Sequence, residues 1–166
     1  VLLNYQKTTH DVFTIAHEMG HSLHSYFSNK AQCYQKADYR IFVAEVASTV
    51  NEVLLIRYLL DTESDKKLKK YLLSYLLEMI RTTLFRQTQF SEFEYFAHSS
   101  VEKGVPLTKD NMCAEYLRLN KKYYGDAVES EGYIKYEWAR IPHFYRAFYV
   151  YKYATGIISA LAISER

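Results

Sequence analysis

The sequence predicts a mainly α-helical fold, because apolar residues recur at helical spacing from Thr8 to the end of its 166 residues. A β-prone run is confined to residues 1–6, where we expect one short edge strand that pairs with residues upstream. No internal repeat, linker or low-complexity stretch interrupts the pattern. We therefore expect residues 1–166 to form a single helical domain.

The first two helices are predicted from caps and apolar spacing. The first runs from Thr8 to about Ser28, since the segment from Thr8 to Asp11 offers hydroxyls and a carboxylate to a helix N-terminus. Its apolar residues follow at helical spacing, at Val12, Ile15, Ala16, Met19 and Leu23. A second helix is expected from about Tyr39 to Asp61, with an apolar surface of valine, leucine and isoleucine.

Three further segments are predicted after the second helix. A long third helix is expected over residues 64–103, where a Gly-Val-Pro sequence ends the pattern. A fourth helix, capped by a threonine, is expected over residues 108–124, followed by a loop over residues 125–132. Pro142 suits the first turn of a last helix through Ala154, and Gly156 marks a break before a final apolar stretch.

The charge balance argues against nucleic acid and membranes as partners. The 21 Lys and Arg residues nearly cancel the 19 Asp and Glu residues, so the formal charge of +2 gives no extended basic surface. Apolar runs are short and interrupted by charges such as Arg57, which argues against a membrane span. Cys33 and Cys113 lie far apart, which favours free thiols in a reducing compartment. The chain opens on Val1 and stops at Arg166 inside a helical pattern, so we expect a fragment of a larger protein.

The strongest motif is His-Glu-x-x-His at residues 17–21, in the middle of the first predicted helix. Residues four apart on a helix lie one turn above each other, so His17 and His21 can both reach one tetrahedral zinc ion. Glu18 lies at the edge of the same face, where it can activate a water molecule as a general base. Gly20 is unfavourable inside a helix and indicates close packing.

Two histidines leave zinc short of its usual three protein ligands. The third histidine that metzincins place six residues after the second is absent, because Phe27 stands there. Glu45 is the better candidate, since it opens a polar stripe with Thr49 and Glu52 on an otherwise apolar helix.

Two other residues near the motif have open interpretations. His24 shares the face of His17 but is displaced along the helix, so we favour a packed or substrate-facing residue over a ligand. Glu52 either orients a zinc-binding histidine through its second nitrogen or is a surface carboxylate.

Three separated motifs, at residues 17–24, 42–49 and 141–156, occur in an order that covers essentially the whole chain. Together they resemble the oligoendopeptidase F branch of the zinc metallopeptidase family that includes thimet oligopeptidase, and within it a C-terminal catalytic fragment. The resemblance implies a helical, zincin-type catalytic domain and a cytoplasmic enzyme that cleaves short peptides inside a channel. It also implies that the remainder of a larger chain supplies the other wall of that channel.

The resemblance further implies roles for individual residues. Glu45 would be the third ligand of one zinc ion per chain, and His143 and Tyr151 would bind the substrate carbonyl. We expect His143 on the same helix as Tyr151, eight residues back, a spacing of slightly more than two turns that keeps both on one face. We interpret the neighbouring Tyr145 and Tyr153 as core residues.

The resulting hypothesis is a zinc-dependent endopeptidase in which Glu18 takes a proton from the attacking water and returns it to the leaving amine. Two alternatives remain. The chain could be a helical binding module that keeps the motif without catalysis, or an exopeptidase that trims single residues from one peptide end.

Overall fold

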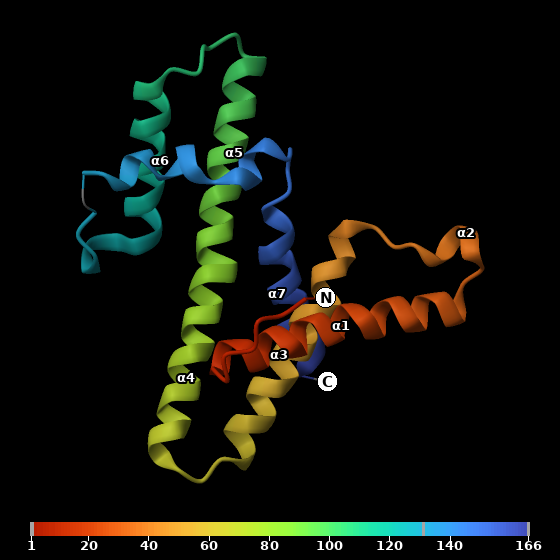
Figure 1. The fold of residues 1–166 in the computed structure, drawn as a ribbon. Coiled ribbons are helices and arrows are strands. Elements are labelled where there is room, and N and C mark those ends of the chain that lie inside the picture. Colours follow the sequence, from red (N-terminus) through yellow and green to blue (C-terminus); the bar gives the residue numbers. More distant parts are fainter. Residues whose placement is uncertain (1, 131, 166) are drawn as a thin grey trace. The chain divides into compact units, whose positions relative to one another are not determined.

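The computed structural model describes residues 2–130 and 132–165 (Figure 1). Most of these residues are helical and none lies in a strand, so the prediction of a mainly α fold is confirmed. The short edge strand is not observed in residues 2–6, and Val1 lies outside the described residues. A strand needs a neighbour that supplies hydrogen bonds to its backbone, and the described part of the chain holds no second strand.

The chain divides into two compact units. The first comprises Val1–Ile80 with Thr155–Arg166, and the second comprises Arg81–Ala154. That residues 1–166 form one domain stays a prediction. The first unit holds four helices and most of a fifth: α1 (Thr9–Ala31), α2 (Tyr34–Ala37), α3 (Ile41–Thr62), α4 (Lys66–Ile80) and the Thr155–Ser164 part of α7 (Tyr151–Ser164).

Helix α1 begins at a complete capping box. The Thr8 hydroxyl accepts a hydrogen bond from the Asp11 backbone N–H at 3.2 Å, and the Asp11 carboxylate accepts one from the Thr8 N–H at 2.9 Å. These bonds satisfy two N–H groups that a helix start leaves free, and those from Thr8 lower the pKa of Asp11. The predicted start of the first helix at Thr8 is thereby confirmed to within one residue.

Helices α1 and α3 are in close backbone contact at Gly20, which is buried. A Cβ atom at Gly20 would lie 2.6 Å from the Ser48 Cα and 2.8 Å from the Ala47 carbonyl oxygen. Both are backbone atoms of α3, so they cannot move aside as a side chain does. The close packing expected at Gly20 is confirmed, and only glycine permits this separation of the two helices.

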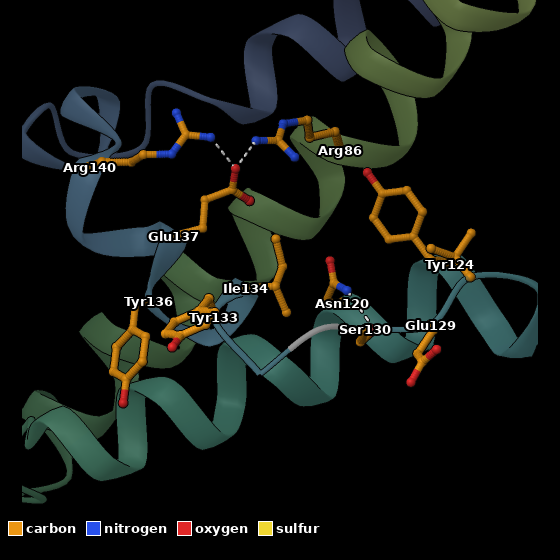
Figure 2. A pocket seen from close by; sticks show the side chains of 11 residues that line it. Arg86, Asn120, Tyr124, Glu129, Ser130, Tyr133, Ile134, Tyr136, Glu137 and Arg140 are labelled. Atoms are coloured by element: carbon orange, nitrogen blue, oxygen red, sulfur yellow. Dashed lines mark hydrogen bonds and ion pairs between the residues drawn. The ribbon is translucent and has the colours of Figure 1, made fainter.

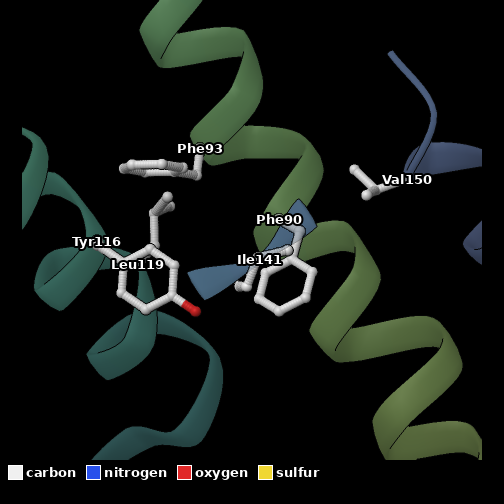
Figure 3. Close-up of a cluster of buried hydrophobic side chains, with 6 residues drawn as sticks. All are labelled: Phe90, Phe93, Tyr116, Leu119, Ile141 and Val150. Carbon is white, nitrogen blue, oxygen red and sulfur yellow. The ribbon is translucent and has the colours of Figure 1, made fainter. Parts of the chain in front are cut away.

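The second unit begins with a π-helical turn and is built around two helices. Its elements are η1 (Arg81–Phe85), α5 (Arg86–Glu102), α6 (Lys109–Tyr124), the 3₁₀ turns η2 (Gly125–Ala127), η3 (Ile134–Arg140) and η4 (Pro142–Tyr145), and the first turn of α7. Side chains from α5, α6 and the segment after η3 form its core, which comprises Phe90, Phe93, Tyr116, Leu119, Ile141 and Val150 (Figure 3). The helix predicted over residues 64–103 corresponds to α4, η1 and α5.

A partly buried network of ion pairs and hydrogen bonds fixes η3 against α5 and α6. The Glu137 carboxylate binds the guanidinium groups of Arg86 and Arg140, as Figure 2 shows, and accepts a 2.7 Å hydrogen bond from the Tyr116 hydroxyl. Tyr116 is fully buried, so its hydroxyl needs such a partner. The network lies beside a cavity of about 610 Å³ lined by polar and aromatic side chains, including Asn120 and Tyr133.

The prediction of one helix over residues 142–154 is wrong. Pro142 opens only the 3₁₀ turn η4, and the chain is then irregular until α7 begins at Tyr151. The cause is Phe148, whose φ of 53° lies in the left-handed region that a right-handed helix excludes. The predicted break at Gly156 is also wrong, because Gly156 is buried inside α7 between the well-packed Ala154 and Ile157.

We expect Gly20→Ala to destabilise the protein, because the new methyl group would overlap the backbone of α3. Overpacking of this kind costs about 1–3 kcal/mol or more in the free energy of unfolding. Gly132→Ala is the matched control, since a Cβ at Gly132 meets no atom within 4 Å. Urea denaturation of both variants measures the effect, and equal midpoints would contradict the packing argument.

Candidate metal centre

Three side chains from α1 and α3 meet at one point of the first unit. The Nε2 atoms of His17 and His21, one helical turn apart, lie 3.2 Å from each other. The Glu45 Oε2 atom of α3 lies 3.4 Å from the His17 Nε2 and 3.8 Å from the His21 Nε2. Within the described residues this is the one place where three or more His, Cys, Asp or Glu side chains bring their possible ligand atoms together.

The spacing of these atoms fits a zinc ion. Bonds of about 2.0–2.1 Å in a tetrahedral arrangement hold neighbouring ligand atoms roughly 3.3–3.4 Å apart. The three observed distances, 3.2, 3.4 and 3.8 Å, scatter around that value. Two imidazoles and one carboxylate also form a donor set that catalytic zinc sites use. The residues present therefore suit the metal that the motif predicts.

Glu52 orients the first histidine. Its carboxylate binds the Nδ1 of His17, which leaves the Nε2 of that ring facing His21 and Glu45. The Glu52 side chain is only 18% exposed. The interpretation of Glu52 as a residue that orients His17 therefore agrees with the structure, and the interpretation as a surface carboxylate does not. Glu45 is held in turn by Ser48, whose hydroxyl lies 3.3 Å from the Oε2 atom.

The electrostatics of the site favour a bound positive charge. Hydrogen bonds to Glu45 and Glu52 raise the pKa of His17 to about 10, and the bond to His17 lowers the pKa of Glu45. Two partly buried carboxylates thus stabilise a cation at this point, and a metal ion supplies one when both histidines are neutral.

Glu18 and His24 are not members of this group of converging side chains. Glu18 is adjacent to His17 and is partly exposed. His24 stacks on Tyr39 with ring centroids 3.7 Å apart, and it is not part of the converging group of ligands. The interpretation of His24 as a packed residue therefore agrees with the structure.

A large groove adjoins the candidate ligands. It has a volume of about 850 Å³ and reaches from His21 and Glu45 along α1 to the connection between α1 and α3. Amide, hydroxyl and carboxylate groups line it, from Ser25, Asn29, Gln35, Asp38 and Tyr39. These groups can bind the amides and side chains of an extended peptide, and sequence reasoning did not identify them because neither the end of α1 nor the connection carries a motif.

In the second unit, His143 lies among tyrosines. Its ring centroid is 5.8 Å from that of Tyr149 and 6.1 Å from that of Tyr153, and the hydroxyls of these two tyrosines are 3.5 Å apart. His143 belongs to η4 whereas Tyr151 opens α7, so the expectation that they share a helix face is wrong. The interpretation of Tyr145 as a core residue is wrong, because 87% of its surface is exposed. Tyr153 is partly buried and packs against the His143 ring, and its interpretation as a core residue stays a prediction.

The first unit thus has the arrangement that defines a zincin-type metallopeptidase fold. A helix that carries His-Glu-x-x-His packs on a second helix that supplies two carboxylates, one as the third candidate ligand and one that orients the first histidine. The chain belongs to peptidase family M3, because the model of that family matches residues 1–166.

Relatives with known names match over the full chain. It is 48% identical to oligopeptidase PepF of Bacillus subtilis and 46% identical to group B oligopeptidase PepB of Streptococcus agalactiae, in each case over 166 residues. It covers 25% and 28% of the length of these two proteins. The chain therefore spans about a quarter of the length of the relatives it matches.

Two solved structures share the fold. The oligoendopeptidase F of Enterococcus faecium matches 94% of the chain with a TM-score of 0.80 and 49% identity. A putative peptidase of Chlamydophila abortus matches 99% with a TM-score of 0.89 and 50% identity. The chain covers 28% of each of these structures. Among its own described residues, no helix is both long and apolar enough to cross a membrane.

Proposed function

We propose that this protein is a zinc-dependent endopeptidase that hydrolyses peptide bonds in short oligopeptides. The observation that carries the proposal is the triangle of His17 Nε2, His21 Nε2 and Glu45 Oε2, with sides of 3.2–3.8 Å. These three residues would hold one zinc ion. The names of the relatives, which include oligopeptidase and oligoendopeptidase, support the substrate class.

A zinc ion bound there supplies Lewis-acid polarisation of the scissile carbonyl and lowers the pKa of a coordinated water. Glu18 would act as the general base, because it neighbours His17 and keeps its carboxylate free of the ligand set. It accepts the proton of the attacking water and returns it to the leaving amine. The polar groove beside His21 and Glu45 would bind the peptide on the first unit.

His143 and one tyrosine would donate hydrogen bonds to the carbonyl oxygen of the substrate as negative charge develops on it. The resemblance assigns the tyrosine to Tyr151, whereas the ring contact with His143 favours Tyr153. We therefore retain both as candidate donors.

The choice of ligands is tested by zinc affinity. We expect Glu45→Ala to abolish most zinc binding, because it removes a ligand, and Glu52→Gln to weaken binding by about 10–100-fold, because it alters the group that orients His17. Competition with a chromophoric chelator measures both. Full zinc occupancy in Glu45→Ala with loss in a Glu52→Ala variant would mean that the third ligand is misassigned.

Glu18→Gln is expected to keep zinc and lose nearly all turnover, since the amide preserves shape but cannot accept a proton. General-base assistance contributes about 10²–10⁴ in rate. Mass spectrometry of the products from peptides of graded length measures turnover and tells endopeptidase from exopeptidase cleavage. More than about a tenth of the normal kcat in Glu18→Gln would exclude the assigned role, and trimming of single residues would favour an exopeptidase.

The two candidate donors are separated by conservative variants. Tyr151→Phe and Tyr153→Phe each remove one hydroxyl and keep the ring. We expect one of them to lower kcat and kcat/KM together, by at most the roughly 10²–10³-fold seen for a lost oxyanion donor, with zinc content unchanged. The other variant should keep kcat and kcat/KM within a few-fold of the values of the unaltered enzyme. If neither variant loses activity, no tyrosine of this pair acts on the carbonyl oxygen.

A further inference from the structure

Glu94 is a buried carboxylate that the proposed reaction does not use. It lies on α5 with only 4% of its surface exposed, and burial raises the pKa of its carboxyl group. Glu and Asp are rarely this buried unless a specific interaction retains them. The interaction here is a 2.6 Å hydrogen bond that the backbone N–H of Phe148 donates to the Glu94 carboxylate, across 54 positions of sequence.

Phe148 needs this bond. Its φ of 53° is left-handed, a conformation that costs a bulky L-residue about 1–2 kcal/mol. The amides of Arg146 and Tyr149 on either side donate to backbone carbonyls, those of His143 and Arg146. The Phe148 amide instead donates its hydrogen bond to a side chain of α5, the carboxylate of Glu94. The His98 ring, one turn along α5, packs on the Phe148 ring with centroids 4.6 Å apart.

The strained residue lies between the groups that the proposed function requires. His143 lies five positions before Phe148. Helix α7, which carries Tyr151 and Tyr153, begins three positions after it. The path of the chain at Phe148 therefore sets where the His143 ring meets Tyr149 and Tyr153. All of these residues belong to the second unit.

We propose that Glu94 is a positioning residue that, by accepting the hydrogen bond of the Phe148 amide, fixes the turn between η4 and α7 and thereby the relative placement of His143 and the tyrosines. The inference rests on the proposed function for its effect on catalysis. Its structural part, the bond that holds the turn, stands on the geometry of α5 and residues 146–150 alone.

Two substitutions of matched length separate hydrogen bonding from packing. Glu94→Met fills the site with an apolar chain that lacks a strong acceptor, whereas Glu94→Gln keeps an acceptor oxygen. We expect Glu94→Met to lower kcat by about 10-fold or more, as misplacement of positioned groups does, while KM stays within about 3-fold and zinc content is unchanged. Glu94→Gln should restore most of kcat.

Glu102→Met is the matched control, because Glu102 lies on the same helix and lines the same cavity of about 400 Å³ but is exposed. It should leave kcat unchanged. A Glu94→Met enzyme with normal kcat and only a lower melting temperature would overturn the proposal. So would a Glu94→Gln enzyme as impaired as Glu94→Met, since an acceptor would then be present without effect.

Hydrogen exchange of the Phe148 amide tests the bond without reference to activity. Exchange should be faster by about 10-fold or more in Glu94→Met and near normal in Glu94→Gln. Unchanged exchange in Glu94→Met would overturn the proposal. If His143→Ala leaves kcat intact, the proposed role of His143 fails, and the exchange data still decide whether Glu94 holds the turn.

Discussion

The contact between α1 and α3 at Gly20 is the constraint on which the candidate metal centre depends. Ligand atoms from two helices reach the spacing of a zinc site only if the helix backbones are held at one fixed separation. The absent side chain of Gly20 allows the Ser48 backbone to approach, and Ser48 itself donates to Glu45. Helix packing and ligand orientation are thus parts of the same interface.

Polar residues on α3 are stabilised by this interface. Glu45 and Glu52 face the two imidazoles of α1, and Asn51 donates a 2.7 Å hydrogen bond to the Ala16 carbonyl oxygen of α1. Partly buried carboxylates are unfavourable without compensation, and here positive charge on His17 or a bound cation provides it. The polar stripe on an apolar helix is therefore explained by its position opposite the motif helix.

The sequence allowed the first unit to be predicted more fully than the second. Helix α1, its capping box and the polar stripe that Glu45 opens on α3 follow from spacings of three or four residues, which local geometry determines. The meeting of that stripe with His17 and His21 is a tertiary contact. The turn after η4 could not be predicted, because the local pattern of residues 142–154 is helical and the interaction that opposes it comes from Glu94 on another helix. The stacking of His24 on Tyr39 depends likewise on a tertiary contact.

The two groups of proposed functional residues are held with different strength. His17 and Glu45 project from α1 and α3, whose backbones are packed together at Gly20. The turn at Phe148 balances a strain of about 1–2 kcal/mol against one hydrogen bond to an acidic group, which contributes roughly 1.5–3 kcal/mol net. The two terms nearly cancel, so the conformation of this turn is sensitive to a change at one buried side chain, whereas the helices that carry the candidate ligands do not depend on that bond.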